Sequence, residues 1–443
     1  MSSHKKSAKE YIGRIRHADN PPYPPKIRRA LASALVFLLS FSLTAGLLIY
    51  IDLSGRLNNL GTASLLGRTP PDSYDGRAIN ILIIGSDSRA GKGNQTLTNN
   101  EDPTERSDTT MVMHISQDRS QVNVVSIPRD LIVDIPACKR GDNSRSKPQR
   151  AQFNWAYSIG SAGSNDRSAA VVCTWKTVEK LSGMRIDESI VVDFNGFSSM
   201  IDALGGINIY VPTKINDKAN SGLVLEPGCK HFNGKEALAY ARVRHGVKGS
   251  DGSDIQRIQR QQAVMGIMMR AALQKNILTS LNQLYGFVGN GLGALTISEG
   301  LSSVSKLSGL GWSLQSIKPD KLRFVTLPVY EAPFDHNRLL LSEDKAEPIW
   351  DAFINDTPLP PGIEVRDGNG KVYTIPEDPS PSSSSSPATS ASESSTPAAT
   401  SSTSESASQD LRPAADLRQS GSLNSELSAE ELAELQRKCE ARN

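Results

Sequence analysis

Two aspartates stand beside apolar runs that are expected to be buried strands. Asp87 follows the run 79–84 within a Gly-Ser-Asp sequence, and Asp108 closely precedes the run 110–115. Ligands of α/β sheets gather at strand ends, and magnesium binds one or two protein carboxylates together with water and phosphate oxygens. We therefore expect Asp87 and Asp108 to hold magnesium, with manganese as the alternative ion. Taken singly, Asp87 has a second interpretation as a turn cap and Asp108 as a surface acid.

Arginines near other strand ends could bind a ligand with several anionic oxygens. Arg129 follows the expected strand 122–127 after a proline, which ends the strand and presents the arginine at its edge. Arg242 and Arg244 alternate within residues 240–244, so an extended segment would direct both side chains to one target. Since a guanidinium binds phosphate through two parallel hydrogen bonds, this set predicts a pyrophosphate ligand. The alternative for any one of these arginines is a solvated surface charge.

The helix expected over residues 255–273 carries a second polar group of this kind. Arg257, Arg260 and Gln261 fall on one face because their spacing is three and four residues, and Asp254 stands at the start of the helix. The arginine face is interpreted as binding phosphate or as forming an ion-pair network. Asp254 is either the N-cap of the helix or a functional group, which accepts a proton from an attacking hydroxyl or orients a phosphate-binding arginine.

Other catalytic patterns are missing from the sequence. Ser86 stands where a Walker A loop requires glycine, and no H-E-x-x-H or G-x-S-x-G motif occurs. The isolated histidines, and the aromatic residues Trp155, Tyr157 and Trp175, are expected to be structural. We therefore expect neither a zinc hydrolase nor a serine hydrolase.

The N-terminal region has the pattern of a membrane anchor. Residues 1–29 are strongly basic, and residues 30–51 contain no charged side chain. At about 1.5 Å per residue, a helix over this run reaches about 33 Å and crosses a bilayer. The positive-inside rule places residues 1–29 in the cytoplasm and the rest outside, so no nucleic-acid partner is expected. A cleaved secretory signal is the alternative, although the apolar run is longer than usual for a signal and no clear cleavage site follows it.

Strand-like runs and helical patterns interleave along residues 78–358. This predicts one α/β domain, an α-β-α sandwich with a mixed central sheet flanked by helices. The expected strands are residues 79–84, 110–115, 122–127, 189–194, 207–211 and 322–327. The expected helices are residues 169–181, 196–204, 234–240, 255–273, 277–288 and 301–310.

The segments around this domain have different compositions. Residues 52–77 are expected to form a stalk between the anchor and the domain. Residues 359–427 are rich in Pro, Ser and Thr and are expected to be disordered, because they cannot bury a core. Residues 428–443 carry a capping pattern and charge pairs that predict one short helix, to which the sequence assigns no role.

The four cysteines fit an oxidising compartment and form no C-x-x-C pair or zinc-site spacing. Cys138 and Cys173 flank one expected loop and helix, so we expect them to form a disulfide. Four cysteines allow three connectivities, and Cys229 and Cys439 have no comparable argument for pairing.

Eight motifs, in this order, resemble those of the LytR-CpsA-Psr family over about residues 79–359. The motifs are G-S-D, R-S-D-T-T-M, S-I-P-R-D, F-N-W-A-Y, V-D-F-N-G-F, D-A-L-G-G-I, A-L-A-Y-A-R-V-R and D-I-Q-R-I-Q-R-Q-Q. The chain departs from the family by an insertion over residues 91–103 and a Gly/Ser-rich loop over residues 246–253. Both segments border the expected site, so the choice of acceptor is the property in which this chain is expected to differ from the family.

The resemblance implies a sheet between helices with a groove for a polyprenyl chain, whose pyrophosphate lies among arginines and magnesium. By motif position, Asp87 and Asp108 take the metal role, and Asp254 acts in catalysis with Arg129 and Arg244. The residues implied to bind pyrophosphate are Arg106, Arg129, Arg242, Arg244, Arg257, Arg260 and Gln261.

The function implied by the resemblance is a magnesium-dependent phosphotransferase anchored in the cell membrane. It would move a glycopolymer from a polyprenyl pyrophosphate carrier to peptidoglycan outside the cytoplasm, forming a phosphodiester. The alternatives are a pyrophosphatase that hydrolyses the carrier, and a membrane-anchored regulator or lipid-binding scaffold without turnover.

Overall fold

The computed structural model describes residues 25–56, 58–71, 73–86, 106–163, 167–247, 253–274, 295–377 and 427–442. The chain forms two compact units, residues 1–52 and 53–443. Several sequence predictions lie outside the described residues: the metal ligand Asp87, the insertion 91–103, most of the loop 246–253, the helix 277–288, and residues 378–426 of the tail.

Helix α1 (Pro25–Arg56) is the long apolar helix that the sequence predicts. Its segment Arg29–Asp52 is long and apolar enough to cross a membrane, a test of length and composition that an N-terminal signal sequence also passes. The helix therefore fits a membrane anchor.

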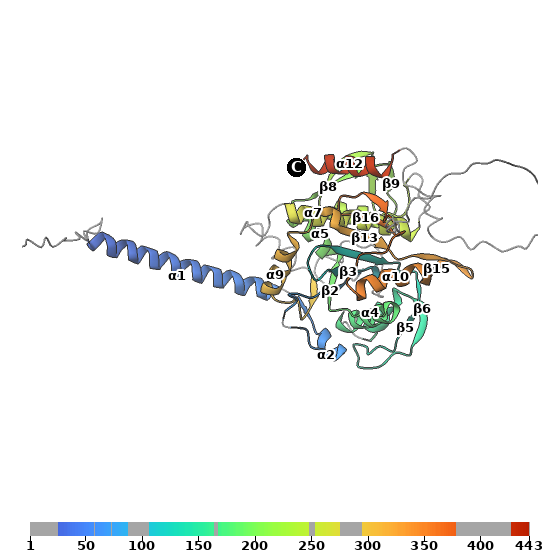
Figure 1. The fold of residues 1–443 in the computed structure, drawn as a ribbon, viewed down its shortest axis with the longest axis horizontal. Coiled ribbons are helices and arrows are strands. Elements are labelled where there is room, and N and C mark those ends of the chain that lie inside the picture. Colours follow the sequence, from blue (N-terminus) through green and yellow to red (C-terminus); the bar gives the residue numbers. More distant parts are fainter. Residues whose placement is uncertain are drawn as a thin grey trace, which may run out of the picture. The chain divides into compact units, whose positions relative to one another are not determined.

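A mixed sheet forms the centre of the second unit (Figure 1). Its strands are β1 (Asn58–Leu60), β2 (Ile79–Ser86), β3 (Ser107–Ile115), β4 (Val122–Ile127), β7 (Glu188–Asp193), β12 (Thr296–Ser298), β13 (Leu322–Thr326), β16 (Glu364–Asp367) and β17 (Val372–Thr374). Among the described residues their order is β1-β12-β7-β2-β3-β4-β13-β16-β17. β2 is parallel to β7 and antiparallel to β3, and β4 is parallel to β13.

Helices cover both faces of this sheet because successive strand residues point to opposite sides. They are α3 (Trp155–Ser161), α4 (Arg167–Ser182) and α10 (Glu343–Ile354) on one face, and α7 (Asp254–Gln274) and α9 (Val304–Leu314) on the other. Leu82 and Ile84 of β2 pack in the core with the first group, whereas Ile81 packs in the core with residues of α7 and α9. Figure 1 shows α4 and α10 on one side of β2 and β3, and α7 on the other.

A further apolar cluster lies on the side of α7 that faces away from the sheet. It joins α7 to α5 (Phe194–Ala203), α6 (Gly234–Arg242), β8 (Ile207–Val211) and β11 (Gly228–Phe232). Gln262 of α7 donates hydrogen bonds to the hydroxyls of Ser126 and Thr326, at 3.0 and 3.2 Å, on β4 and β13. These bonds fix α7 against the ends of two central strands.

Smaller elements complete the described part of the second unit. Four two-stranded sheets pair β5 (Ile132–Ile135) with β6 (Gln149–Gln152), β8 with β11, β9 (Ile215–Asp217) with β10 (Leu223–Leu225), and β14 (Val329–Ala332) with β15 (Asp335–Leu341). The last described helix is α12 (Ala429–Glu440).

The predicted α/β architecture is confirmed, and all six predicted strands are present as β2, β3, β4, β7, β8 and β13. The sheet reaches beyond residues 78–358 in both directions. Residues 52–77, expected to be a stalk, contain β1 and α2 (Thr62–Leu66), and β1 pairs in parallel with β12. At the other end, residues 359–377 were expected to belong to a disordered tail, but they contain β16 and β17, which extend the sheet.

One predicted core aromatic residue is not buried. Tyr157 and Trp175 are enclosed as expected, but 46% of Trp155 is exposed. Trp155 is the first residue of α3, whose buried face is formed by residues that include Ala156 and Tyr157, so the side chain of Trp155 is left facing solvent.

Both pairs of cysteines form disulfides. The predicted pair Cys138–Cys173 is present, and Cys229 pairs with Cys439. The second bond links β11 to α12, which lie far apart in the sequence.

Candidate active site

Arg129 lies at the centre of a cluster of charged side chains. Strand β4 ends at Ile127, and Pro128 turns the chain so that Arg129 stands at the end of the strand, as predicted. Its Nη1 lies 2.8 Å from Oδ1 of Asp108, and its Nε lies 3.3 Å from Oδ2 of Asp130 and 3.4 Å from Oδ1 of Asp254. One guanidinium thus contacts three carboxylates.

Arg257 extends this cluster along α7. Its Nη2 lies 2.5 Å from Oδ1 of Asp254 and donates to the carbonyl oxygen of Asp108 at 3.1 Å. The side chain of Arg257 is only 4% exposed, which excludes the alternative of a solvated surface charge for this residue. Among the described residues, its buried Nε has no hydrogen-bond partner.

Asp254 is not the cap of α7. Ser253 takes that position, since its hydroxyl accepts a hydrogen bond from the backbone N–H of Gln256 at 3.5 Å. The sequence Ser-Asp-Ile-Gln matches the capping-box pattern, a signal from which the sequence alone could have identified the cap. The carboxylate of Asp254 is therefore free of the capping role and lies between Arg129 and Arg257.

Burial and neighbouring charges shift the pKa values of the cluster. Burial raises the pKa of Asp254 to about 6, although Arg129 and Arg244 favour the ionised carboxylate. Burial lowers the pKa of Arg129, but the charges of Asp108, Asp254 and Asp130 outweigh it, so the pKa is raised overall. Burial and the adjacent charge of Arg129 lower the pKa of Arg244. A carboxyl with a pKa near neutral can accept a proton during a reaction at physiological pH.

The prediction of an extended segment over residues 240–244 is wrong. Helix α6 continues through Arg242, because its alanines and its Asn233–Glu236 capping box favour helix. The side chain of Arg242 is stacked over the ring of Phe194, at 4.5 Å from the ring centroid, whereas Arg244 lies beyond the helix end beside the Arg129 cluster. The two arginines therefore do not alternate on a strand toward one target.

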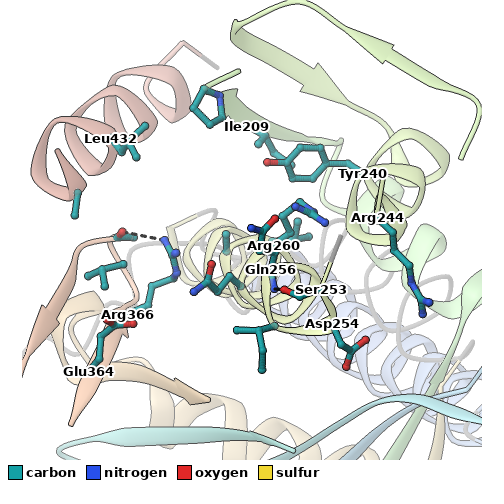
Figure 2. Close-up of a pocket in the computed structure, with 18 of the residues that line it drawn as sticks. Ile209, Tyr240, Arg244, Ser253, Asp254, Gln256, Arg260, Glu364, Arg366 and Leu432 are labelled. Carbon is teal, nitrogen blue, oxygen red and sulfur yellow. Dashed lines mark hydrogen bonds between the residues drawn. The ribbon is translucent and has the colours of Figure 1, made fainter. Parts of the chain in front are cut away.

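A cavity of about 670 Å³ opens beside this cluster. The cluster residues that line it are Arg129, Asp130, Arg244 and Asp254, and Arg260 lines it as well. Figure 2 shows Arg244 and Asp254 on one side of the cavity and Glu364, Arg366 and Leu432 on the other. The cavity can thus hold a ligand whose anionic group lies against Arg129 and Arg244 and whose remainder reaches the opposite wall.

The other predicted phosphate ligands lie around the cluster in different ways. Arg260 is buried and donates a hydrogen bond to the carbonyl oxygen of Val243. Gln261 follows it on α7, and its buried Oε1 has no hydrogen-bond partner among the described residues. Arg106 is exposed at the residue before β3.

Some cavity residues were not identified from the sequence. Asp130 belongs to the quoted S-I-P-R-D motif, and it accepts a hydrogen bond from Gln152 at 2.8 Å as well as contacting Arg129. Glu364 and Arg366 of β16 and the residues of α12 come from beyond the predicted domain. A helix was predicted over residues 428–443, but nothing in the sequence placed it or β16 at the site.

Of the two expected metal ligands, Asp108 lies within the described residues. Among them, no group of three or more His, Cys, Asp or Glu side chains is placed to hold a metal ion. The carboxylate of Asp108 is 33% exposed and shares Oδ1 with Arg129, so it fits the role of a single oxygen ligand to a hard cation.

The sequence belongs to the LytR_cpsA_psr family, whose model it matches over residues 64–353. The matched region contains the Arg129 cluster, and it ends before β16 and α12. This membership confirms the resemblance seen in the motifs.

Characterised relatives are distant. The chain is 27% identical over 225 residues to the probable cell wall biosynthesis protein LcpB of Corynebacterium glutamicum, covering 50% of this chain and 48% of that one. It is 28% identical over 262 residues to the polyisoprenyl-teichoic acid–peptidoglycan teichoic acid transferase TagV of Bacillus subtilis, covering 58% and 59%. The match thus covers between about half and three fifths of the length of these relatives.

A solved structure shares the fold. The protein gbs0355 of Streptococcus agalactiae superposes with a TM-score of 0.51 at 17% identity, covering 68% of this chain and 93% of that one. This likeness supports the fold alone.

Proposed function

We propose that the protein is a phosphotransferase that moves a glycopolymer from a polyprenyl pyrophosphate carrier to peptidoglycan. The relative TagV is named as a polyisoprenyl-teichoic acid–peptidoglycan transferase, and family membership makes the same reaction class the first candidate. The observation that carries the proposal is the convergence of Arg129, Arg244 and Asp254 at one end of a cavity, with Arg257 paired to Asp254.

This cluster suits a pyrophosphate because it pairs cationic donors with a carboxylate of raised pKa. Arg129 and Arg244 neutralise charge on the phosphate under attack and on the departing polyprenyl phosphate. Asp254, which stands against both Arg129 and Arg257, accepts the proton of the attacking hydroxyl.

The reaction forms one bond to phosphorus and breaks another. An oxygen of the peptidoglycan acceptor bonds to the phosphorus nearest the glycan, and the bond from that phosphorus to the bridging oxygen breaks. The products are a phosphodiester between glycan and wall, and polyprenyl phosphate, which keeps the bridging oxygen. No nucleotide is consumed, which suits a site outside the cytoplasm.

Asp87 and Asp108 would hold magnesium, which supplies further neutralisation of the pyrophosphate when bound. In the described part of the chain, Asp108 already lies against Arg129, so a metal there would be adjacent to the phosphate site.

We further propose that α1 anchors the protein in the cell membrane with its N-terminus in the cytoplasm and residues after Ile51 outside. The basic residues before the apolar run favour this orientation. Two disulfides agree with an oxidising compartment.

An assay with the full chain tests the function. Purified protein in detergent would receive a polyprenyl pyrophosphate-linked glycan, with or without a peptidoglycan oligomer, in magnesium or in EDTA. The proposal expects glycan on the oligomer and release of polyprenyl phosphate in magnesium, with little transfer in EDTA. Release of glycan phosphate without an acceptor would instead indicate a pyrophosphatase, and binding without either product would indicate a scaffold.

A further inference from the structure

Helix α12 belongs to a part of the chain that the family does not account for. The family match ends at residue 353, and residues 378–426 separate the end of the central domain from the helix. α12 begins with a complete capping box between Ser428 and Glu431, so the helix is locally encoded.

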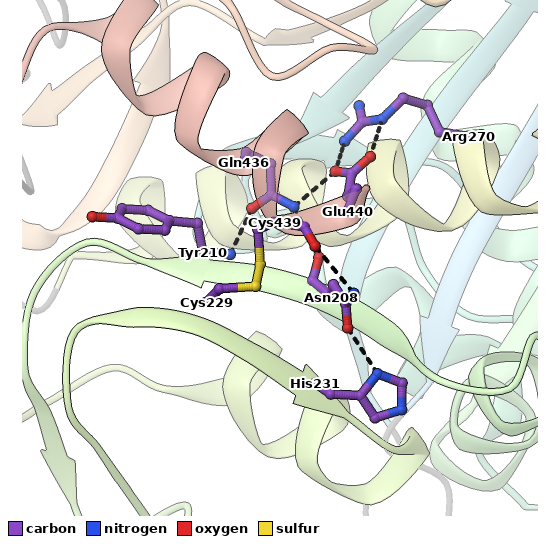
Figure 3. Close-up of a disulfide and its surroundings, with 8 residues drawn as sticks. All are labelled: Asn208, Tyr210, Cys229, His231, Arg270, Gln436, Cys439 and Glu440. Carbon is purple, nitrogen blue, oxygen red and sulfur yellow. Dashed lines mark hydrogen bonds and ion pairs between the residues drawn. A yellow bond between two sulfur atoms is a disulfide. The ribbon is translucent and has the colours of Figure 1, made fainter. Parts of the chain in front are cut away.

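Three kinds of contact hold α12 on the domain (Figure 3). The Cys229–Cys439 disulfide joins it to β11. The side-chain amide of Gln436 accepts from the backbone N–H of Tyr210 at 2.7 Å and donates to the backbone carbonyl of Asn208 at 2.9 Å. It thereby pairs with β8 as a neighbouring strand would.

A buried ion pair adds to this attachment. The guanidinium of Arg270, only 4% exposed, makes two hydrogen bonds to the carboxylate of Glu440, one of them from Nε at 2.8 Å. A buried arginine without this partner would be costly, so the last turn of α12 is specified by a residue of α7. The position of the helix is therefore built into the domain.

From this position α12 forms one wall of the active-site cavity. The lining residues from this segment are Leu427, Ala429, Leu432, Ala433 and Gln436. Figure 2 shows Leu432 across the cavity from Arg244 and Asp254. Any ligand held at the arginines that extends across the cavity meets α12.

The lining of the cavity is mixed, with apolar side chains such as Ile209, Val264 and Leu432 beside polar ones. A saccharide, which offers both C–H faces and hydroxyls, fits such a lining. The cavity is also lined by Gln259, Glu364 and Arg366, which offer hydrogen-bond donors and acceptors. A hydrocarbon lying against them would remove water without replacing its hydrogen bonds, which is unfavourable. Sugar hydroxyls would replace those bonds, while the C–H face of a sugar ring would pack on Leu432.

We propose that α12 is a specificity wall that contacts the saccharide directly attached to the donor pyrophosphate. This inference rests on the proposed function, and it assigns to residues outside the family region the selection of which glycan is accepted. The arginine cluster would bind the pyrophosphate of any donor, and α12 would distinguish the sugars.

Two soluble probes test the proposal on the full chain in detergent, by isothermal titration calorimetry. Geranyl pyrophosphate carries the head group and a short hydrocarbon, and geranyl pyrophosphoryl-N-acetylglucosamine adds one sugar. Leu432→Trp places a bulky ring in the cavity, and Glu434→Trp places the same ring on the exposed face of α12.

We expect Leu432→Trp to weaken binding of the glycosylated probe by about tenfold or more and to leave geranyl pyrophosphate unchanged. Glu434→Trp should match the wild type with both probes. Leu432→Ala, which removes atoms and introduces no clash, should weaken only the glycosylated probe, by a smaller factor. Peptide mapping without reduction is the control, and it should find the Cys229–Cys439 disulfide intact in each variant.

Equal loss of both probes in the Leu432 variants, or no loss of the glycosylated probe, would overturn the specificity wall. Wild-type protein that binds neither probe would overturn the proposed function, and this proposal with it. The two failures are therefore distinguishable.

Discussion

At the scale of single residues, the proposed mechanism requires that Asp254 act as a proton acceptor and not as the cap of α7. Ser253 caps α7, and Asp254 contacts Arg129 and Arg257 with a side chain that is only 10% exposed. Asparagine has nearly the same shape but cannot accept a proton at neutral pH.

Asp254→Asn should therefore lower transfer by about 10²- to 10⁴-fold while donor binding changes little. Rates are measured in the transfer assay, and the melting temperature is measured by calorimetry as a control for the fold. A variant that transfers at the wild-type rate would show that the base lies elsewhere.

The raised pKa of Asp254 predicts a pH dependence. Burial brings the pKa to about 6, so the carboxyl is protonated and inactive as a base below that pH and ionised above it. Transfer should rise as pH increases from 5 to 7, with an inflection near 6, and the residual rate of Asp254→Asn should lack this inflection. The profile is measured as initial rate at fixed ionic strength, and a flat wild-type profile would contradict the assignment.

Arg129 holds three carboxylates through different nitrogens of one planar group. Lysine keeps the charge but has a single ammonium, which cannot contact Asp108 and Asp254 in the same arrangement. Arg129→Lys should lower transfer by about tenfold or more. Arg185→Lys, at a largely exposed arginine, is the matched control and should leave the rate unchanged. Wild-type transfer rates in both variants would show that Arg129 does not act at the phosphate site.

At the scale of elements, the first disulfide ties the segment after β5 to α4. Cys138 and Cys173 are both buried, and they are 35 residues apart in the sequence. Their bond restricts the unfolded chain and links α4 to the segment after β5, and both cysteines belong to the apolar core of this face.

Replacing both cysteines by serine should lower the free energy of unfolding by about 2 to 5 kcal/mol. Urea denaturation of the full chain in detergent measures the change. Reducing conditions open Cys229–Cys439 as well, so the same titration under reduction should remove the difference between the variant and the wild type. Equal stability of the two proteins without reductant would mean that the Cys138–Cys173 bond contributes little.

At the scale of the whole molecule, α1 should keep the protein attached to the membrane. The apolar segment Arg29–Asp52 is long enough to span, and basic residues precede it. Protease added to intact cells should degrade the domain after residue 52 and leave a protected N-terminal fragment. The membrane fraction should retain the full chain, and a soluble product beginning near residue 46 would instead indicate a cleaved signal.

Much of the fold could be predicted from the sequence because its signals are local. The strands β2, β4 and β8 are short apolar runs with clear ends, and the start of α7 carries its own capping pattern. Arg129 was also predictable, since a proline after a strand fixes where the next side chain emerges.

Tertiary structure alone decided how these residues meet. Asp108, Arg129 and Asp254 come from three separate segments. The pairing of β3 with β4 places Asp108 within 4 Å of Arg129, and the packing of α7 over the ends of β4 and β13 places Asp254 within 4 Å of Arg129. Arg242 was placed wrongly because the alternating pattern of residues 240–244 fits a strand, whereas the capping box and packing of α6 favour helix. On the far wall of the cavity, the capping box of α12 encodes the helix locally, but its position had no local signal. That position depends on Cys229, Tyr210 and Arg270, which lie well over a hundred residues earlier in the chain. A sequence pattern specifies an element through its near neighbours, but a site is formed by long-range contacts, which no local pattern contains.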